Sequence, residues 1–121
     1  FEDTGLNPKD YDLIITGDLG KVGVDLTKQL LNKMNIDISD VYTDCGLKIY
    51  DTEKQDTHSG GSGCGCSASV LNGYLIKEIK KGKYNRVLFV ATGALLSPIS
   101  TMQGESIPSI AHAVTIQRTL E

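Results

Sequence analysis

The chain has 121 residues and a hydrophobic content of 40%, which is enough for one domain with a buried core. Fifteen acidic residues against twelve basic ones give a net charge of -3, so a nucleic-acid-binding surface is not expected. No apolar stretch approaches the roughly 20 residues that a membrane span requires. We therefore expect a single soluble domain that does not bind nucleic acid.

The first predicted unit is a strand, a turn and a helix. Residues 11–16 (YDLIIT) are mostly β-branched or aromatic and are followed by a glycine-containing turn at 17–20. From residue 21 to 34, apolar side chains recur at helical spacing, which predicts a helix. Asp18 lies in the turn, where it is either a ligand-binding group or, as we favour, a cap of that helix.

The middle of the chain predicts a second strand, a loop and a second helix. The stretch Leu47–Tyr50 has strand character, and residues 56–65 are polar and rich in Gly and Ser, which is typical of a loop. Apolar residues at helical spacing then predict a helix over 66–81, ended by Gly82. Residues 87–92 (VLFVAT) are apolar throughout, as in a central strand with both faces covered.

A last strand is predicted at Ile110–Ile116, after a long loop at 93–109. The order of elements indicates an α/β fold with a layered, mixed, mostly parallel sheet and helices on both faces. Its last two strands should pair antiparallel. The residues expected in the core are Leu13, Ile14, Leu26, Leu30, Leu71, Leu75, Leu88 and Val90.

The two ends of the chain are assigned separately. The first residue is Phe rather than Met, which suggests a piece of a longer protein. Residues 1–9 are polar and turn-rich and are interpreted as a linker before a domain at 10–119. Leu120 and Glu121 fit either the native chain or a cloning scar, so no functional reasoning rests on them.

The most unusual segment is HSGGSGCGCSA, at residues 58–68, which runs directly into the predicted helix. Glycines allow close approach to the backbone, and a helix N-terminus presents unpaired amides and the positive end of the helix dipole. A carboxylate or phosphate is a suitable ligand for such a turn. The alternative is that the glycines only allow the helix to pack tightly against the sheet.

The cysteines and histidines suggest neither a metal site nor a cofactor. His58, Cys64 and Cys66 lack the spacing and the fourth ligand of a zinc site. A catalytic thiolate with His58 or His112 as base is chemically feasible, but small packing roles are the simpler interpretation. Three irregularly spaced cysteines indicate a reducing, intracellular setting.

Several long strings resemble a known family. They are DYDLIITGDLGKVG (10–23), DCGLKIYD (44–51), QDTHSGGSGCGCSA (55–68), RVLFVATGALLSP (86–98) and QGESIPSIAHAV (103–114). Together they are similar to the C-terminal half of the stage V sporulation protein AD family, in the thiolase and ketoacyl synthase III superfamily. The resemblance implies a thiolase-like half domain, with an active-site pocket between this half and an N-terminal half of similar fold.

The resemblance also implies that the superfamily's second-half catalytic residues are missing. Segment 61–69 is similar to the thiolase turn GHPxGASGA, and the catalytic His of that turn falls on Ser62. The catalytic Cys of the thiolase CxGGG turn falls on Thr92. The loop after that strand is longer than in thiolases, which would place 97–107 near the pocket. No catalytic residue is therefore assigned.

The family resemblance implies non-catalytic binding of dipicolinic acid, a pyridine with two carboxylates, for its uptake into the developing spore. It implies as partners the protein's own N-terminal half and other stage V sporulation membrane proteins, with peripheral attachment to the forespore or spore inner membrane. Separately, we expect the chain to expose an apolar patch through which it can pair with itself as a homodimer, with the helix at 66–81 as the contacting element. The candidate ligand-binding residues are His58, Ser62, Gly63, Cys64, Gly65, Cys66, Ser67, Thr92 and Gly93.

Two other functions fit the same residues. One is an acyl-CoA condensing or thiolytic transferase whose nucleophile is supplied by the N-terminal half. The other is a scaffold that docks onto spore membrane proteins.

Overall fold

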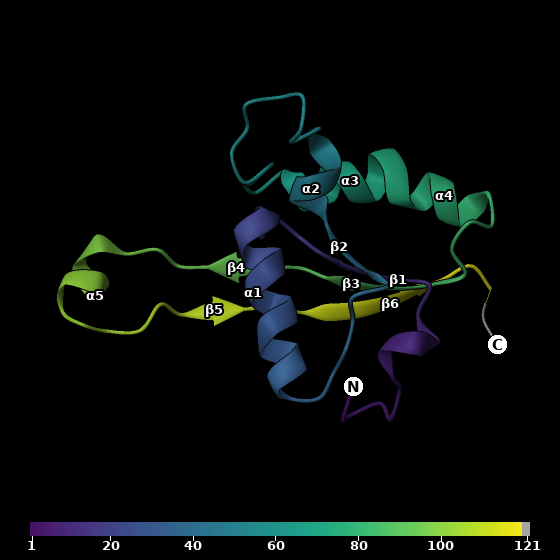
Figure 1. Cartoon of the computed structure of the whole chain (residues 1–121), viewed down its shortest axis with the longest axis horizontal. Helices are drawn as coiled ribbons and strands as arrows, with labels where there is room; N and C mark the ends of the chain where they lie inside the picture. Colours follow the sequence, from purple (N-terminus) through teal and green to yellow (C-terminus); the bar gives the residue numbers. More distant parts are fainter. Residues whose placement is uncertain (120–121) are drawn as a thin grey trace.

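The computed structural model describes residues 1–119 and is built on a four-stranded sheet in the order β2-β1-β3-β6 (Figure 1). The strands are β1 (Leu13–Thr16), β2 (Tyr42–Asp44), β3 (Arg86–Val90) and β6 (Ala113–Gln117). β1 is parallel to β2 and β3, whereas β6 is antiparallel to β3. The expected α/β fold, with a mostly parallel sheet and a final antiparallel pair, is confirmed.

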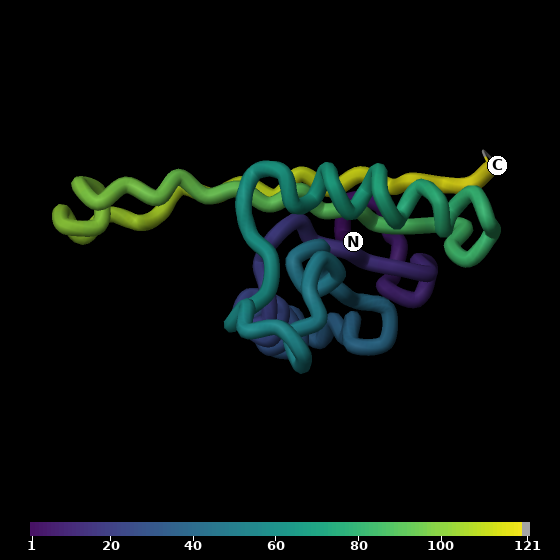
Figure 2. The backbone as a smooth tube through the Cα atoms, turned by 90° about the horizontal axis from the view of Figure 1, so that it is seen from above, coloured from purple at the N-terminus to yellow at the C-terminus, as the bar shows by residue number. Residues whose placement is uncertain are grey.

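Helices cover the two faces of this sheet. On one face, Val24 of α1 (Gly20–Lys33) packs in a cluster with Ile14 and Tyr42. The other face is covered by a long helix that spans α3 (Cys66–Val70), η2 (Leu71–Leu75) and α4 (Ile76–Lys80). Leu75 of this helix packs with Ile15 of β1 and Val87 of β3. Figure 2 shows this long helix running along the strands, with α1 below them and seen end on.

The long helix agrees with the prediction over 66–81 but is not α-helical throughout. Its middle segment, η2, is a π-helical turn. Such a turn inserts one extra residue per turn, so it shifts the buried side of the helix along its length. The helix ends before Gly82, which has a φ of +80°. A glycine in this left-handed conformation commonly terminates a helix.

The strand predicted at Leu47–Tyr50 is wrong. The strand β2 lies earlier, and residues Cys45–Ile49 form the short helix α2. The side chain of Asp44 is the N-cap, because its Oδ1 accepts a hydrogen bond from the Gly46 amide at 2.9 Å. This capping bond outweighs the weak strand preference of the four residues that follow.

The prediction that Leu26 and Leu30 belong to the core is wrong. Leu26 and Leu30 are 52% and 60% exposed, and with Val22 and Met34 they form an apolar stripe on the outer side of α1. The helix instead turns Val24 toward the sheet. Leu13, Ile14 and Leu75 are buried as predicted, whereas Leu71, Leu88 and Val90 are half-buried.

The segment predicted as a long loop is an ordered arm. β4 (Gly93–Ala94) pairs antiparallel with β5 (Ser109–Ile110), and α5 (Pro98–Met102) lies at the tip. Both views show this arm extending away from the sheet and helices (Figures 1 and 2). Residues 97–107 are therefore at the tip of the arm rather than beside the pocket described below, and the strand expected at 110–116 is split between β5 and β6.

The N-terminal residues contact the domain. Phe1 and Leu6 pack against the cluster that contains Tyr11, and Pro8–Asp10 form the short 3-10 helix η1. The boundary at residue 9 stays a prediction, and Leu120 and Glu121 lie outside the described residues. Among residues 1–119, no helix is both long and apolar enough to cross a membrane.

Candidate functional site

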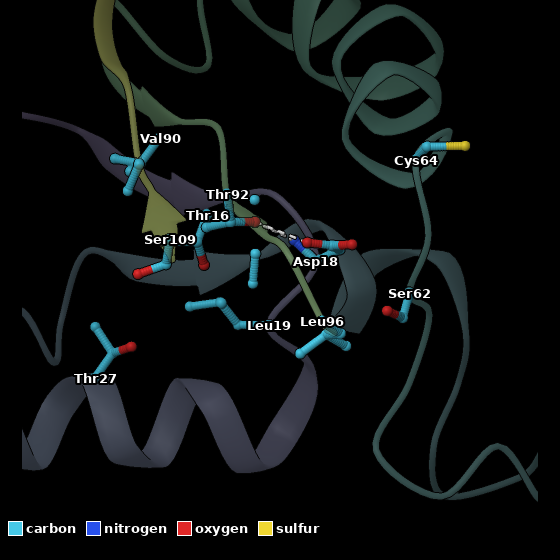
Figure 3. A pocket seen from close by; sticks show the side chains of 13 residues that line it. Thr16, Asp18, Leu19, Thr27, Ser62, Cys64, Val90, Thr92, Leu96 and Ser109 are labelled. Carbon is cyan, nitrogen blue, oxygen red and sulfur yellow. Dashed lines mark hydrogen bonds between the residues drawn. The ribbon is translucent and has the colours of Figure 1, made fainter. Parts of the chain in front are cut away.

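A cavity of about 740 Å³ lies where β1 and β3 end, between α1, the base of the arm and the glycine-rich loop at residues 56–65 (Figure 3). Ligand sites in α/β sheets are commonly found at the carboxyl ends of parallel strands. Its polar lining residues are Thr16, Asp18, Thr27, Ser62, Cys64, Thr92 and Ser109. Its other lining residues are Leu19, Val90, Gly93, Ala94, Leu96 and Ala111.

Asp18 joins three parts of the pocket. Its Oδ1 accepts a hydrogen bond from the Thr92 hydroxyl at 2.7 Å, and its Oδ2 accepts one from the Gly63 amide at 3.1 Å. The Asp18 amide in turn donates to the Thr92 hydroxyl at 3.2 Å. The turn after β1, the end of β3 and the glycine-rich loop are thus connected through one side chain.

The role predicted for Asp18, capping of α1, is wrong. The N-cap position of α1 is Leu19, and no side chain caps the helix there. The amides of Leu19 and Gly20 donate instead to the buried carboxylate of Asp44, each at 3.0 Å. Since Asp44 satisfies the start of α1, Asp18 is available to bind Thr92 and the glycine-rich loop.

Asp44 is the anchor beneath the pocket. Its side chain is fully buried, and besides the two α1 amides it accepts hydrogen bonds from the Thr16 hydroxyl at 2.6 Å and the Gly46 amide at 2.9 Å. A buried carboxylate is stable only when donors surround it in this way. Asp44 therefore fixes the end of β1, the start of α1 and the start of α2 relative to one another.

The glycine-rich loop is fixed to α1 and α2 by backbone hydrogen bonds. The Lys21 amide donates to the Ser59 oxygen at 2.7 Å, and the Gly61 amide donates to the Gly46 oxygen at 2.8 Å. The close approach requires glycine at position 20, where φ is +64° and a Cβ would lie 2.6 Å from the Ser59 oxygen. The position of the loop beside the pocket is therefore fixed at Ser59 and Gly61.

Beyond these anchors, the end of the loop leaves amides available to a ligand. The Gly63 amide is bound to Asp18, and the Cys66 amide donates to the Gly63 oxygen at 3.0 Å. Within the described part of the chain, the amides of Ser62 and Cys64 have no hydrogen-bond partner. Both residues line the cavity, and both are exposed.

The structure divides the nine predicted ligand-binding residues into two groups. Ser62, Cys64, Thr92 and Gly93 line the cavity, and Gly63 contacts it through Asp18. The remaining four do not line it. Of these, the His58 side chain is 90% exposed, with Nδ1 3.6 Å from a carboxylate oxygen of Asp56. Cys66 is buried in the core, Ser67 is half-buried and Gly65 is exposed.

Sequence reasoning missed several lining residues. Thr16, Leu19, Ser109 and Ala111 line the pocket, and although they lie in strings that resemble the family, no functional pattern marks them as site residues. Thr16 had one usable signal, because it is the last residue of a predicted parallel strand. The positions of Ser109 and Ala111 depend on the pairing of β5 with β4 and of β6 with β3, which no local pattern encodes.

The two buried cysteines, Cys45 and Cys66, have raised thiol pKa values. Burial, followed by the nearby carboxylates of Asp44 and Asp18, raises the pKa of the Cys66 thiol above its usual range. Burial and the adjacent Asp44 carboxylate raise the pKa of Cys45 to about 12. Both thiols are therefore neutral at physiological pH, and a thiolate nucleophile at Cys66 is disfavoured. Cys64 is the exposed thiol of the three.

Comparison with known proteins gives one family. A family model described as Stage V sporulation protein AD (SpoVAD) matches residues 1–117. Stage V sporulation protein AD from Bacillus subtilis (strain 168) is 48% identical to this chain over 118 residues. That match covers 98% of this chain and 35% of the relative, so the chain spans about a third of the relative's length.

Proposed function

The chain belongs to the stage V sporulation protein AD family, and from this premise we propose that its pocket binds dipicolinic acid without catalysing a reaction. In this proposal the protein holds the ligand during its uptake into the developing spore. The chemistry required is recognition of a flat, apolar ring that carries carboxylates. The observation that carries the proposal is the pair of unpartnered amides at Ser62 and Cys64.

Those amides suit a carboxylate because they are donors whose position is fixed by the backbone. Gly63 lies between them and is bound to Asp18, so the loop does not have to be ordered when a ligand arrives. Donors that are already in position bind an anion at a lower entropic cost than flexible side chains do. The glycines at 63 and 65 leave open space around this part of the backbone, since a Cβ at either would meet no atom within 4 Å.

The rest of the cavity suits the ring. Leu19, Val90 and Leu96 supply apolar surface, and Thr92 and Ser109 supply hydroxyl groups. Its volume of about 740 Å³ falls within the range of roughly 300–1,000 Å³ that is common for small-molecule sites. An apolar wall with a few polar groups is the usual composition of such sites.

The proposal extends to the surfaces that the chain leaves exposed. The apolar stripe of α1 and the small residues Ala68, Ser69 and Gly73 on the long helix are exposed. We propose that the N-terminal half of the longer protein, a second copy, or stage V membrane proteins cover these faces. Such partners would keep the protein peripherally attached to the forespore or spore inner membrane.

Calorimetry on the full-length protein tests the ligand assignment. Dipicolinate should give saturable heat with an affinity in the micromolar range or weaker, because both carboxylates must lose water on binding. Ser62→Asp should weaken binding by about tenfold or more, since it places a negative charge beside the proposed carboxylate site. Ser62→Asn is the matched control, with a similar shape and no charge, and should stay within about threefold of the wild type.

Two outcomes would contradict the proposal. One is the absence of heat with dipicolinate. The other is equal affinity for the wild type and for the Asp and Asn variants, which would place binding elsewhere. Turnover of acetoacetyl-CoA by the same sample would favour the transferase alternative.

A further inference from the structure

We propose that Asp18 sets the charge preference of the pocket, by disfavouring ligands with two ionised carboxylates relative to ligands with one. This inference rests on the proposed function, because it concerns how the same pocket receives a pyridine carboxylate. The Asp18 carboxylate is hydrogen-bonded to Thr92 and Gly63 of this chain, so in this proposal it acts on a ligand through its charge.

The first support is the sign of the charge in the pocket. Asp18 is the one carboxylate among the described residues that line the cavity, and none of those residues is Lys, Arg or His. A bound anion therefore meets a negative side chain with no cation among the described lining residues of this chain to offset it. Charges of like sign repel, and the repulsion is stronger in a partly enclosed site than in open water.

The second support is that Asp18 is held in place. It is half-buried, both of its carboxylate oxygens accept a hydrogen bond, and its own amide is bound to Thr92. Turning the carboxylate away from a ligand would break the bonds to Thr92 and Gly63 together. The ligand, rather than the protein, must therefore adjust to the charge.

The third support is where the carboxylate lies. In Figure 3, Asp18 lies between the residues at the ends of the strands, Thr16 and Thr92, and the loop residues Ser62 and Cys64. A ring with one carboxylate at the loop amides can place its uncharged side toward the strands. A ring with a second carboxylate brings another negative charge past Asp18, which costs affinity.

A comparison of two ligands on matched variants isolates this effect. The probes are dipicolinate, with two carboxylates, and pyridine-2-carboxylate, with one, and the measured quantity is the ratio of their dissociation constants on the full-length protein. Asp18→Asn removes the charge and also perturbs the hydrogen bonds to Thr92 and Gly63. Because that structural loss acts on both ligands, it cancels in the ratio, as in a double-mutant cycle.

We expect Asp18→Asn to shift the ratio by about three- to fivefold in favour of dipicolinate, which is the scale of a partly exposed charge pair. Thr92→Val is the first control. It removes the hydroxyl that binds Asp18 but keeps the charge, so it should change both affinities and leave the ratio unchanged. Asp40→Asn removes an exposed charge just before β2, at the opposite end of the strands from the pocket, and should change neither.

The outcomes separate the two proposals. If neither acid binds the wild-type protein, the proposed function fails. If both bind and Asp18→Asn leaves the ratio unchanged, or shifts it toward the monocarboxylate, the charge preference is overturned while the proposed function stands. A shift with Thr92→Val as large as with Asp18→Asn would also overturn it, because loop position and not charge would then set the preference.

Discussion

Two aspartates in the first half of the chain have opposite relations to the pocket. Asp44 is fully buried and surrounded by donors, so its carboxylate is part of the scaffold. Asp18 lines the cavity, and its bonds connect elements that border it. The difference between a structural carboxylate and one that lines the cavity thus depends on which backbone amides each one reaches.

Replacing Asp44 should strongly destabilise the domain. Asp44→Ala leaves the amides of Leu19, Gly20 and Gly46 without their acceptor, and a buried unpaired donor costs about 1–3 kcal/mol. We expect the free energy of unfolding to fall by about 3 kcal/mol or more, measured by urea denaturation. Asp40→Ala, at an exposed position nearby in the sequence, should change it by less than about 0.5 kcal/mol, and an equal effect of the two changes would contradict this role.

At this scale, the sequence predicted the region of the pocket but not its detail. The small residues at 62–64 could be identified because a glycine-rich turn before a helix is a local pattern, and Thr92 could be identified from the family resemblance. The contacts of Asp18 could not be found in that way, because its partners Gly63 and Thr92 lie 45 and 74 residues along the chain. Only the strand order β2-β1-β3-β6 brings these three segments together.

At the scale of the elements, the glycine-rich loop and α2 form one unit. The backbone oxygen of Gly61 lies where a side chain at position 46 would project, and the Gly46 oxygen accepts from the Gly61 amide at 2.8 Å. The loop that borders the pocket is therefore held by a helix that sequence reasoning predicted as a strand. The missed signal was Asp44 two residues before Gly46, a typical N-cap position.

Adding a methyl group at Gly46 should separate the loop from α2. Gly46→Ala forces backbone against backbone, so we expect a loss of about 2 kcal/mol in unfolding free energy and weaker dipicolinate binding. Gly73→Ala in the 121-residue chain is the control for stability, because a Cβ there meets no atom of this chain within 4 Å. The control should be neutral or stabilising by up to about 1 kcal/mol. Thermal unfolding and calorimetry of both variants check this, and retained stability in Gly46→Ala would contradict the close contact.

Elsewhere, helices and strands could be predicted wherever the pattern of apolar residues extends over many residues. The helices at 20–33 and 66–80 and the strands β1 and β3 follow from apolar patterns in the sequence. Periodicity alone could not choose which side of α1 packs on the sheet, because both sides carry apolar residues. Val24 is buried, whereas the stripe that contains Leu26 and Leu30 is exposed.

At the scale of the whole molecule, large apolar side chains are exposed in two places, on α1 and on the arm. The outer stripe of α1 contains Val22, Leu26, Leu30 and Met34, each more than half exposed. The arm exposes Leu95, Leu96, Ile99 and Met102 to a similar or greater extent. Contiguous exposed apolar surface commonly marks an interface in proteins.

Making the α1 stripe polar should reduce self-association without unfolding the domain. Leu26→Gln with Leu30→Gln changes side chains that are already 52% and 60% exposed, so stability should shift by less than about 1 kcal/mol. Light scattering of the 121-residue chain should show less association than the wild type at equal concentration. Lys33→Gln, on the same helix, should have no such effect, and a wild-type chain that stays monomeric at high concentration would contradict self-association through this stripe.

The most direct test of the pocket as the ligand site is the rate at which Cys64 is alkylated as dipicolinate is added to the full-length protein. Cys64 lines the cavity and is exposed, whereas Cys45 and Cys66 are buried and serve as internal references that react slowly. If the carboxylate binds at the loop amides, the rate for Cys64 should fall in a saturable way, with the midpoint found by calorimetry. An unchanged Cys64 rate at dipicolinate concentrations that saturate the heat signal would contradict this site.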